Sequence, residues 1–257
     1  MNKTVNTENI MVIPDIHGRN FWKSCIDKVK DHMIIFLGDY IDPYPYNMDI
    51  FESSEYKILQ ENSIENLKDI IQFKKDNIDN VVLLLGNHDC SYMYDQNICR
   101  SRHDYKNHEE ISKLFKENKH LFQLAYTTYI DNNIILFSHA GVHKLWIEDI
   151  CNKLNKDIPF EHNVSSFLNE LYYKQPSNVM VNILKQIPWS RGGYDSVGSC
   201  IWTDLYDWDD ELYSEYNCKQ IFGHTQLNNT GNIVCQENKY YCVDSRKIFE
   251  LTEILSK

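Results

Sequence analysis

Five short motifs in this 257-residue chain combine aspartate, histidine and asparagine side chains with glycine. Carboxylate, amide and imidazole groups of this kind bind divalent ions such as manganese, iron or zinc. Two of them at positions i and i+2 of an extended segment point to the same side, so Asp15 and His17 can share one ion. The full set supplies ligands for two adjacent ions. In chain order the motifs are Asp15-Ile16-His17, Gly38-Asp39, Gly86-Asn87-His88-Asp89, His139-Ala140-Gly141 and Gly223-His224.

The first three motifs each follow a short apolar segment, at residues 10–13, 33–37 and 81–85. Continuous apolar runs of this length predict strands that are buried on both faces. Segments of helical length, 21–30 and 55–73, lie between them. This alternation predicts a parallel sheet with right-handed crossovers, in which the polar groups at the carboxyl ends of the strands share one crevice.

The second half of the chain has a different organisation. Segments 126–130 and 134–137 flank a turn and predict a hairpin, and a mostly helical stretch follows over 143–186. We expect a strand at 220–222, a second hairpin at 233–235 and 240–243, and a last strand at 248–254. Because the sequence contains no repeat and no low-complexity linker, we predict one domain over residues 1–257 with a helical insertion at about 143–199.

The order of the motifs resembles that of the metallophosphoesterase superfamily. The sequence is most similar to the branch that holds the Ser/Thr phosphoprotein phosphatases and the symmetrical diadenosine tetraphosphatases. The segment Gly38-Asp39-Tyr40-Ile41-Asp42 resembles the G-D-Y-V/I-D motif of that branch, and Ile201-Trp202-Thr203-Asp204 resembles its L-W-S/T-D segment. The resemblance implies a calcineurin-like α/β (α+β) fold, with a central β-sandwich flanked by helices.

The resemblance also implies a role for each position. Asp39 bridges two divalent ions, which we expect to be manganese, with iron, zinc and nickel as alternatives. A metal-activated hydroxide then attacks phosphorus, and His88 protonates the leaving oxygen as general acid. Asp42 is its partner, because a carboxylate bonded to histidine stabilises the charged imidazolium. The implied metal ligands are Asp15, His17, Asp39, Asn87, His139 and His224.

Two arginines that bind phosphate in this branch are missing here. Pro43 follows the segment 38–42 that resembles G-D-Y-V/I-D, and the acidic segment 207–211 follows the segment 201–204 that resembles L-W-S/T-D. A phosphate favours a bidentate guanidinium, and we predict that Arg191 supplies it, with Arg100 and Arg102 as alternatives. Gln226 replaces the second histidine of the G-H-x-H motif found in many phosphodiesterases of the superfamily, which favours the phosphatase branch.

Several other residues receive structural interpretations. Gly141 interrupts the spacing between His139 and His143, so we exclude His143 from the metal site. The acidic segment 204–210 lacks the spacing of a calcium loop and is expected to face solvent. Cys90 is expected to be a buried bystander thiol. Tyr44, Tyr46 and Trp189 are candidates for a pocket that stacks a base.

Composition excludes several functions. The net charge of −11 argues against binding to nucleic acid polymers or to anionic membranes. The chain has neither a secretory h-region nor an apolar segment that approaches the ~18 residues of a membrane span. Eight scattered cysteines form no C-x-x-C pair, so we expect reduced thiols in the cytoplasm, with a Cys235–Cys242 disulfide as the alternative.

We therefore predict a phosphatase that hydrolyses phosphomonoesters of a phosphorylated substrate, most simply a Ser/Thr-type protein phosphatase. The alternative is a nucleotide hydrolase that acts on dinucleoside polyphosphates, which the missing arginines leave open. A third reading is an inactive scaffold that binds a partner through the helical insertion. The filled metal positions and the His88–Asp42 pair argue against it.

Overall fold

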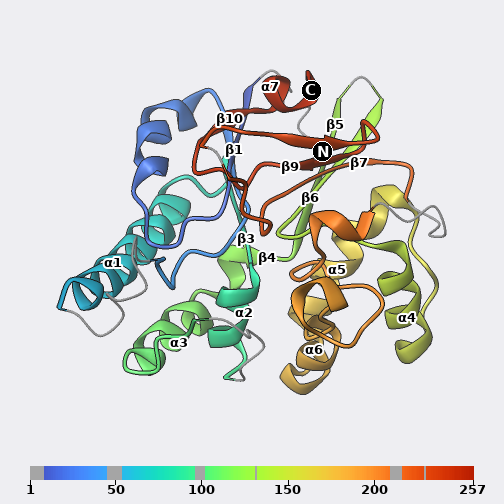
Figure 1. Cartoon of the computed structure of the whole chain (residues 1–257), viewed down its shortest axis with the longest axis horizontal. Coiled ribbons are helices and arrows are strands. Elements are labelled where there is room, and N and C mark those ends of the chain that lie inside the picture. Colours follow the sequence, from blue (N-terminus) through green and yellow to red (C-terminus); the bar gives the residue numbers. More distant parts are fainter. Residues whose placement is uncertain (1–8, 45–53, 96–101, 131, 209–215, 229) are drawn as a thin grey trace.

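Two five-stranded sheets form the centre of the protein (Figure 1). The computed structural model describes residues 9–44, 54–95, 102–130, 132–208, 216–228 and 230–257. The first sheet has the order β10 (Phe249–Glu250), β1 (Ile10–Ile13), β2 (Met33–Phe36), β3 (Val81–Leu84) and β4 (Phe122–Gln123). The second has the order β5 (Ala125–Ile130), β6 (Asn133–Ser138), β7 (Lys219–Phe222), β9 (Tyr240–Cys242) and β8 (Val234–Gln236).

Strand directions follow the sequence pattern. Strands β1 to β4 are parallel, and β10 runs antiparallel along β1. In the second sheet β5–β6 and β8–β9 are antiparallel pairs, whereas β7 lies parallel to both of its neighbours. The predicted parallel sheet and both predicted hairpins are therefore present.

The parallel strands are buried on both faces, as their continuous apolar runs predict. Val12, Ile35 and Val82 lie side by side in register and pack toward the second sheet. The next residue on each of β1 and β2, Ile13 and Phe36, belongs to a different buried cluster that packs against the helices. Because successive side chains of a strand point to opposite faces, each strand contributes to both cores. This arrangement confirms the predicted sandwich flanked by helices.

Helices surround the sheets in two groups. Figure 1 shows α1 (Ser54–Asp76), α2 (Asn87–Met93) and α3 (His108–Glu117) at the lower left and α4 (Lys144–Leu154), α5 (Val164–Lys174) and α6 (Ser177–Leu184) at the lower right. The short helix α7 (Leu251–Leu255) lies near the C-terminus. Within the described ranges no helix is long and apolar enough to cross a membrane. The 3-10 helices are η2 (Phe21–Lys30), η4 (Lys119–Leu121), η5 (Glu161–Asn163), η6 (Trp189–Arg191) and η7 (Leu205–Trp208).

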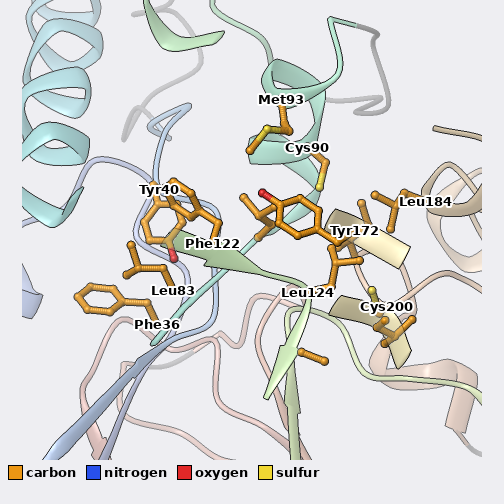
Figure 2. Close-up of a cluster of buried hydrophobic side chains, with 14 of the residues drawn as sticks. Phe36, Tyr40, Leu83, Cys90, Met93, Phe122, Leu124, Tyr172, Leu184 and Cys200 are labelled. Carbon is orange, nitrogen blue, oxygen red and sulfur yellow. The ribbon is translucent and has the colours of Figure 1, made fainter. Parts of the chain in front are cut away.

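One apolar cluster joins the two groups of helices behind the motif-bearing loops (Figure 2). Phe36, Leu83 and Phe122 of the first sheet belong to the same buried cluster as Met93 of α2 and Tyr172 of α5. Cys90 lies within it and is fully buried, so it is the bystander thiol that we expected. Burial raises the pKa of its thiol well above the ordinary value, which keeps it protonated.

Two secondary-structure predictions are wrong in type. The segment 248–254 contains only the two-residue strand β10 and then turns into α7. Leu251 and Ile254 are three residues apart, a spacing that places both on one face of a helix and that a strand would divide between its two faces. The helix predicted at 21–30 is present as the 3-10 helix η2. The elements α2, α3 and β4 were not anticipated.

Candidate metal centre

Side chains from five loops meet at the carboxyl ends of the strands. His17 and Asp39 follow β1 and β2, Asn87 begins α2, and His139 and His224 follow β6 and β7. The Nε2 atom of His139 lies 3.1 Å from Asn87 Oδ1, 3.1 Å from His224 Nδ1 and 3.5 Å from Asp39 Oδ2. His17 Nε2 lies 3.7 Å from the same Asp39 oxygen. The structure therefore brings together residues that are far apart in sequence.

The potential ligands form two groups that share Asp39. One group contains His17, Asp39 and His88, and the other contains Asp39, His139 and His224. Within each group the donor atoms lie within 4.8 Å of one another. A carboxylate common to both groups is the arrangement that a pair of neighbouring ions needs. The first group thus includes His88, for which the family resemblance implies the role of general acid.

Asp15 lies beside the two groups of potential ligands and belongs to neither of them. Its two carboxylate oxygens accept from the backbone N–H of His224 at 3.1 and 3.2 Å, although the two residues are 209 positions apart. A Cβ atom at Gly223 would stand 2.0 Å from Asp15 Oδ1, so only glycine permits this approach. Asp15 is thus placed beside the centre but outside both close groups.

Hydrogen bonds at the outer nitrogens orient the imidazoles. His17 Nδ1 lies 2.9 Å from the carbonyl oxygen of Ile41, and His139 Nδ1 lies 2.9 Å from that of Leu37. A carbonyl only accepts, so each Nδ1 carries the proton and each Nε2 presents a lone pair to the centre. Burial lowers the pKa of His17, His139 and His224, which favours the neutral form that binds metals.

Buried carboxylates crowd the same site. Burial raises the pKa of Asp15 well above its ordinary value, and the charges of Asp244 and Asp39 raise it further. Burial likewise raises the pKa of Asp244 to about 7 and that of Asp89 to about 8. Such a cluster of negative groups is stable only when protons or cations neutralise it. The neutral imidazoles and these oxygens fit divalent ions. The sequence analysis did not single out Asp244.

Four residues of the site have a backbone conformation that favours glycine. The φ angles of His17, Asp39, Asp42 and His224 are 43°, 51°, 57° and 62°. Each such residue costs about 1–3 kcal/mol and persists only where the surrounding structure enforces its conformation. Their concentration at the strand ends indicates that the fold is strained in order to aim these side chains inward.

Asp89 holds the loop that carries Asp39. Its carboxylate accepts from the backbone N–H groups of Asp39, Tyr40 and Gly86 at 2.7, 3.0 and 2.8 Å. Asp89 is fully buried in the first turn of α2, so the helix and the loop are tied together. Asp89 is the final residue of the Gly-Asn-His-Asp motif, but the sequence analysis assigned it no role.

His88 and Asp42 form the predicted pair. His88 Nδ1 lies 2.6 Å from Asp42 Oδ2, and both side chains are almost completely buried. The backbone N–H of His88 donates to Asp39 Oδ1 at 3.0 Å, which places the pair directly beside the potential metal ligands. Nδ1 therefore faces Asp42, and Nε2 lies on the opposite side of the ring.

A cavity of about 100 Å³ opens over these groups. Arg191 of η6 lines this cavity and donates to Thr225 Oγ1 at 2.8 Å and to the His224 carbonyl at 3.2 Å. It also forms an ion pair with Asp204. Asp204 is buried, so the prediction of a solvent-facing acidic segment is wrong at this residue. The lining residues are His17, Arg19, Asp39, Tyr44, Asn87, His88, Arg191, Trp202, His224, Gln226 and Asp244.

The alternative arginine Arg102 lies close to the pair rather than on the cavity wall. It donates to the Asp42 carbonyl oxygen at 3.0 Å and covers the ring of Tyr44, whose edge contacts His17. Arg100 and Tyr46 lie outside the described residues. Trp189 is 74% exposed and does not line the cavity. Arg19, which does line it, was missed by the sequence analysis although it follows the first motif directly.

Two further predictions concern residues outside the centre. His143 is buried at the start of α4, where its side chain accepts from the Leu145 N–H at 3.3 Å and stacks on Trp208. Cys235 and Cys242 belong to β8 and β9 and are free thiols, so the alternative disulfide is absent.

A family model for the calcineurin-like phosphoesterases matches residues 8–228. The match covers most of the chain, so the protein belongs to this family and is a metal-dependent phosphoesterase. A search of curated protein sequences finds no match.

Comparison with solved structures finds matches at low sequence identity. One is a cold-active protein tyrosine phosphatase of a psychrophilic Shewanella species, with 16% identity and a TM-score of 0.50 over 93% of this chain and 72% of that one. A point mutant of a cold-active protein tyrosine phosphatase gives 17% identity and a TM-score of 0.51 over the same shares of the two chains. The phosphatase domain of the Legionella effector WipB has 15% identity and a TM-score of 0.43, over 80% of this chain and 77% of that one.

Proposed function

We propose that this protein is a dinuclear phosphomonoesterase. The observation that carries the proposal is the position of Asp39, which belongs to both groups of potential ligands. His17 and Asp15 would hold the first ion with Asp39. The second would be held by Asp39 and by Asn87, His139 and His224. When bound, the two ions would activate water and neutralise phosphoryl charge near neutral pH. Manganese is the expected metal, because oxygen and imidazole ligands without thiolate suit it.

The protein's own groups position and protonate the substrate. Nε2 of His88 donates a proton to the leaving oxygen, while Asp42 stabilises the imidazolium from the other side of the ring. Arg191 binds phosphoryl oxygens at the cavity wall, and Arg19 adds a second guanidinium that also lines the cavity. The ion pair with Asp204 keeps the Arg191 side chain extended into the site.

We propose phosphoprotein, with phosphoserine or phosphothreonine, as the substrate class. The proposal is supported by the two segments that resemble the Ser/Thr phosphatase branch, at 38–42 and 201–204. Phosphotyrosine belongs in the same test, because the Shewanella neighbour is named as a tyrosine phosphatase. A dinucleoside polyphosphate is the second candidate. It is favoured by Tyr44, a 40% exposed aromatic side chain on the cavity wall beside two arginines.

We further propose one domain with a helical insertion at about 143–199, and a cytoplasmic location. The location is supported by the free thiols of all seven described cysteines, since reduced cysteines are typical of that compartment.

The first experiment is hydrolysis of p-nitrophenyl phosphate with added Mn²⁺. We expect Asp39→Asn to lower turnover by at least about a hundredfold, because metal ligands matter more than the groups around them. His162→Ala, which changes an exposed histidine outside the site, is the matched control and should retain full activity. Absence of turnover, together with no Mn²⁺ binding by titration calorimetry, would favour the inactive scaffold.

The second experiment compares substrates. A panel of phosphoserine, phosphothreonine and phosphotyrosine peptides is assayed beside diadenosine tetraphosphate, with kcat/KM as the readout. We expect the serine and threonine peptides to be preferred. A preference of roughly a hundredfold for the nucleotide would overturn the protein phosphatase proposal, since such ratios measure differential transition-state binding.

A further inference from the structure

Asp42 accepts a second hydrogen bond that the mechanism above does not use. Its Oδ2 faces His88, and its Oδ1 accepts from the phenolic O–H of Tyr92 at 2.7 Å. Both bonds are buried, and Tyr92 has no exposed surface. His88 and Tyr92 are four residues apart on α2, so they lie on one face of the helix. Two side chains on one turn of this helix therefore hydrogen-bond to the two oxygens of the Asp42 carboxylate.

The direction of the Tyr92 bond is determined by its other partner. The backbone N–H of Asp104 donates to the Tyr92 oxygen at 2.7 Å. This oxygen is therefore an acceptor toward Asp104, and its single proton points to Asp42. Burial and the Asp42 carboxylate raise the pKa of the Tyr92 phenol, so it remains a donor. The ring is stacked on His103 with centroids 4.2 Å apart, which fixes its plane.

Asp42 needs such support because its backbone is strained. Its φ of 57° lies in the left-handed region, and its carbonyl oxygen is held by Arg102 at 3.0 Å. Arg102 fixes the main chain, whereas Tyr92 fixes the side chain. Without the hydroxyl, the carboxylate keeps its hydrogen bond to His88 but loses one of the two bonds that fix its plane.

We propose that Tyr92 is a positioning residue for the general acid. It occupies one oxygen of Asp42 so that the other faces His88 Nδ1, and the imidazolium then presents Nε2 to the leaving group. The inference rests on the proposed function, in which His88 is the acid. Tyr92 itself does not line the cavity, so it acts only through Asp42.

The test compares leaving groups in the Mn²⁺-loaded protein. A general acid matters for phenyl phosphate, whose leaving oxygen needs a proton, and matters little for 2,4-dinitrophenyl phosphate. We expect Tyr92→Phe to lower kcat on phenyl phosphate by roughly tenfold, with kcat on the dinitrophenyl ester and both KM values unchanged. Tyr172→Phe is the matched control, because it removes another buried tyrosine's hydrogen bond, to the Lys119 carbonyl, and should change neither rate.

A second readout does not depend on activity. The proton between His88 Nδ1 and Asp42 should give a downfield resonance in the protein loaded with diamagnetic Zn²⁺, assigned by its loss in His88→Ala. We expect this resonance to move upfield in Tyr92→Phe and to stay in place in Tyr172→Phe. If Tyr92→Phe does not fold, the wild-type spectrum decides, since a Tyr92 hydroxyl proton protected from exchange and close to the His88 proton is expected.

The outcomes separate the two proposals. Equal loss on both esters, or an unmoved resonance in folded Tyr92→Phe, overturns the role of Tyr92. An unprotected Tyr92 hydroxyl proton in the wild type overturns it as well. If the wild-type protein hydrolyses neither ester, the proposed function fails, and the resonance shift still decides whether Tyr92 positions the Asp42–His88 pair.

Discussion

Replacing Gly86 by alanine tests the metal centre with a single methyl group. The backbone of Gly86 has φ −96° and ψ −179°, which alanine adopts without strain. The added Cβ would stand 2.1 Å from Asp39 Oδ1, however, and 2.7 Å from the Asp39 backbone nitrogen. The three atoms nearest to the added Cβ all belong to Asp39, the residue shared by both ligand groups.

The magnitude follows from the contact. An ordinary contact begins near 3.4 Å, so the carboxylate must move by roughly 1.3 Å. Metal sites tolerate ligand displacements of about 0.2 Å, and disturbing groups around the ligands already costs about 10–100-fold in affinity. We expect Gly86→Ala to weaken Mn²⁺ binding by at least about a hundredfold and to lower turnover in parallel. Overpacking should also cost about 1–3 kcal/mol of folding free energy.

Titration calorimetry with Mn²⁺ measures the affinity, and urea unfolding measures the stability. The control is Gly231→Ala, whose Cβ meets only the flexible Lys247 side chain and whose φ is 84°. It should lose about 1 kcal/mol from backbone strain and bind Mn²⁺ normally. Normal Mn²⁺ affinity in Gly86→Ala would refute the steric argument and the shared position of Asp39.

Two other predictions concern stability. Burial lowers the pKa of His143 to about 4, below its ordinary value of 6.5, so the unfolded chain takes up the proton first. The contribution of His143 to stability is therefore complete above pH 6.5 and falls by about 3 kcal/mol as the pH decreases to 4, so the change that urea unfolding measures over this range should differ by about 3 kcal/mol between the wild type and His143→Gln. Arg191→Ala should cost about 1–3 kcal/mol because it leaves the buried Asp204 carboxylate without its ion pair. Adding Asp204→Asn should recover part of that loss, and no recovery in urea unfolding would contradict the pairing.

Patterns of apolar residues predicted the secondary structure correctly where the pattern fits only one type of element. The apolar runs 10–13, 33–37 and 81–85 contain the strands β1, β2 and β3, because they have no polar side that could face water. The prediction failed at 248–254, where the three-residue spacing of Leu251 and Ile254 suits one face of a helix and not one face of a strand. The strand β10 pairs with β1 over two residues only, and the helix α7 begins directly after it. The length of such a pairing depends on the partner strand and cannot be predicted from the segment itself.

The amino-acid sequence alone predicts which side chains lie at the ends of the strands and can therefore meet there. Motifs such as Asp15-Ile16-His17 and Gly86-Asn87-His88-Asp89 combine a ligand, a turn and a preceding strand within a few positions, and local chemistry is sufficient to identify them. The family match over residues 8–228 agrees with that interpretation.

Only the tertiary structure decided which partners those side chains have. Tyr92 with Asp42, Arg191 with Asp204 and Asp244 beside Asp15 are pairings between distant segments, and none leaves a periodic trace in the sequence. Each depends on strand register and on the angle at which a helix or loop docks, and many burial contacts together determine both. Residue type and spacing thus predict the potential ligands, whereas their protonation, orientation and support arise from packing.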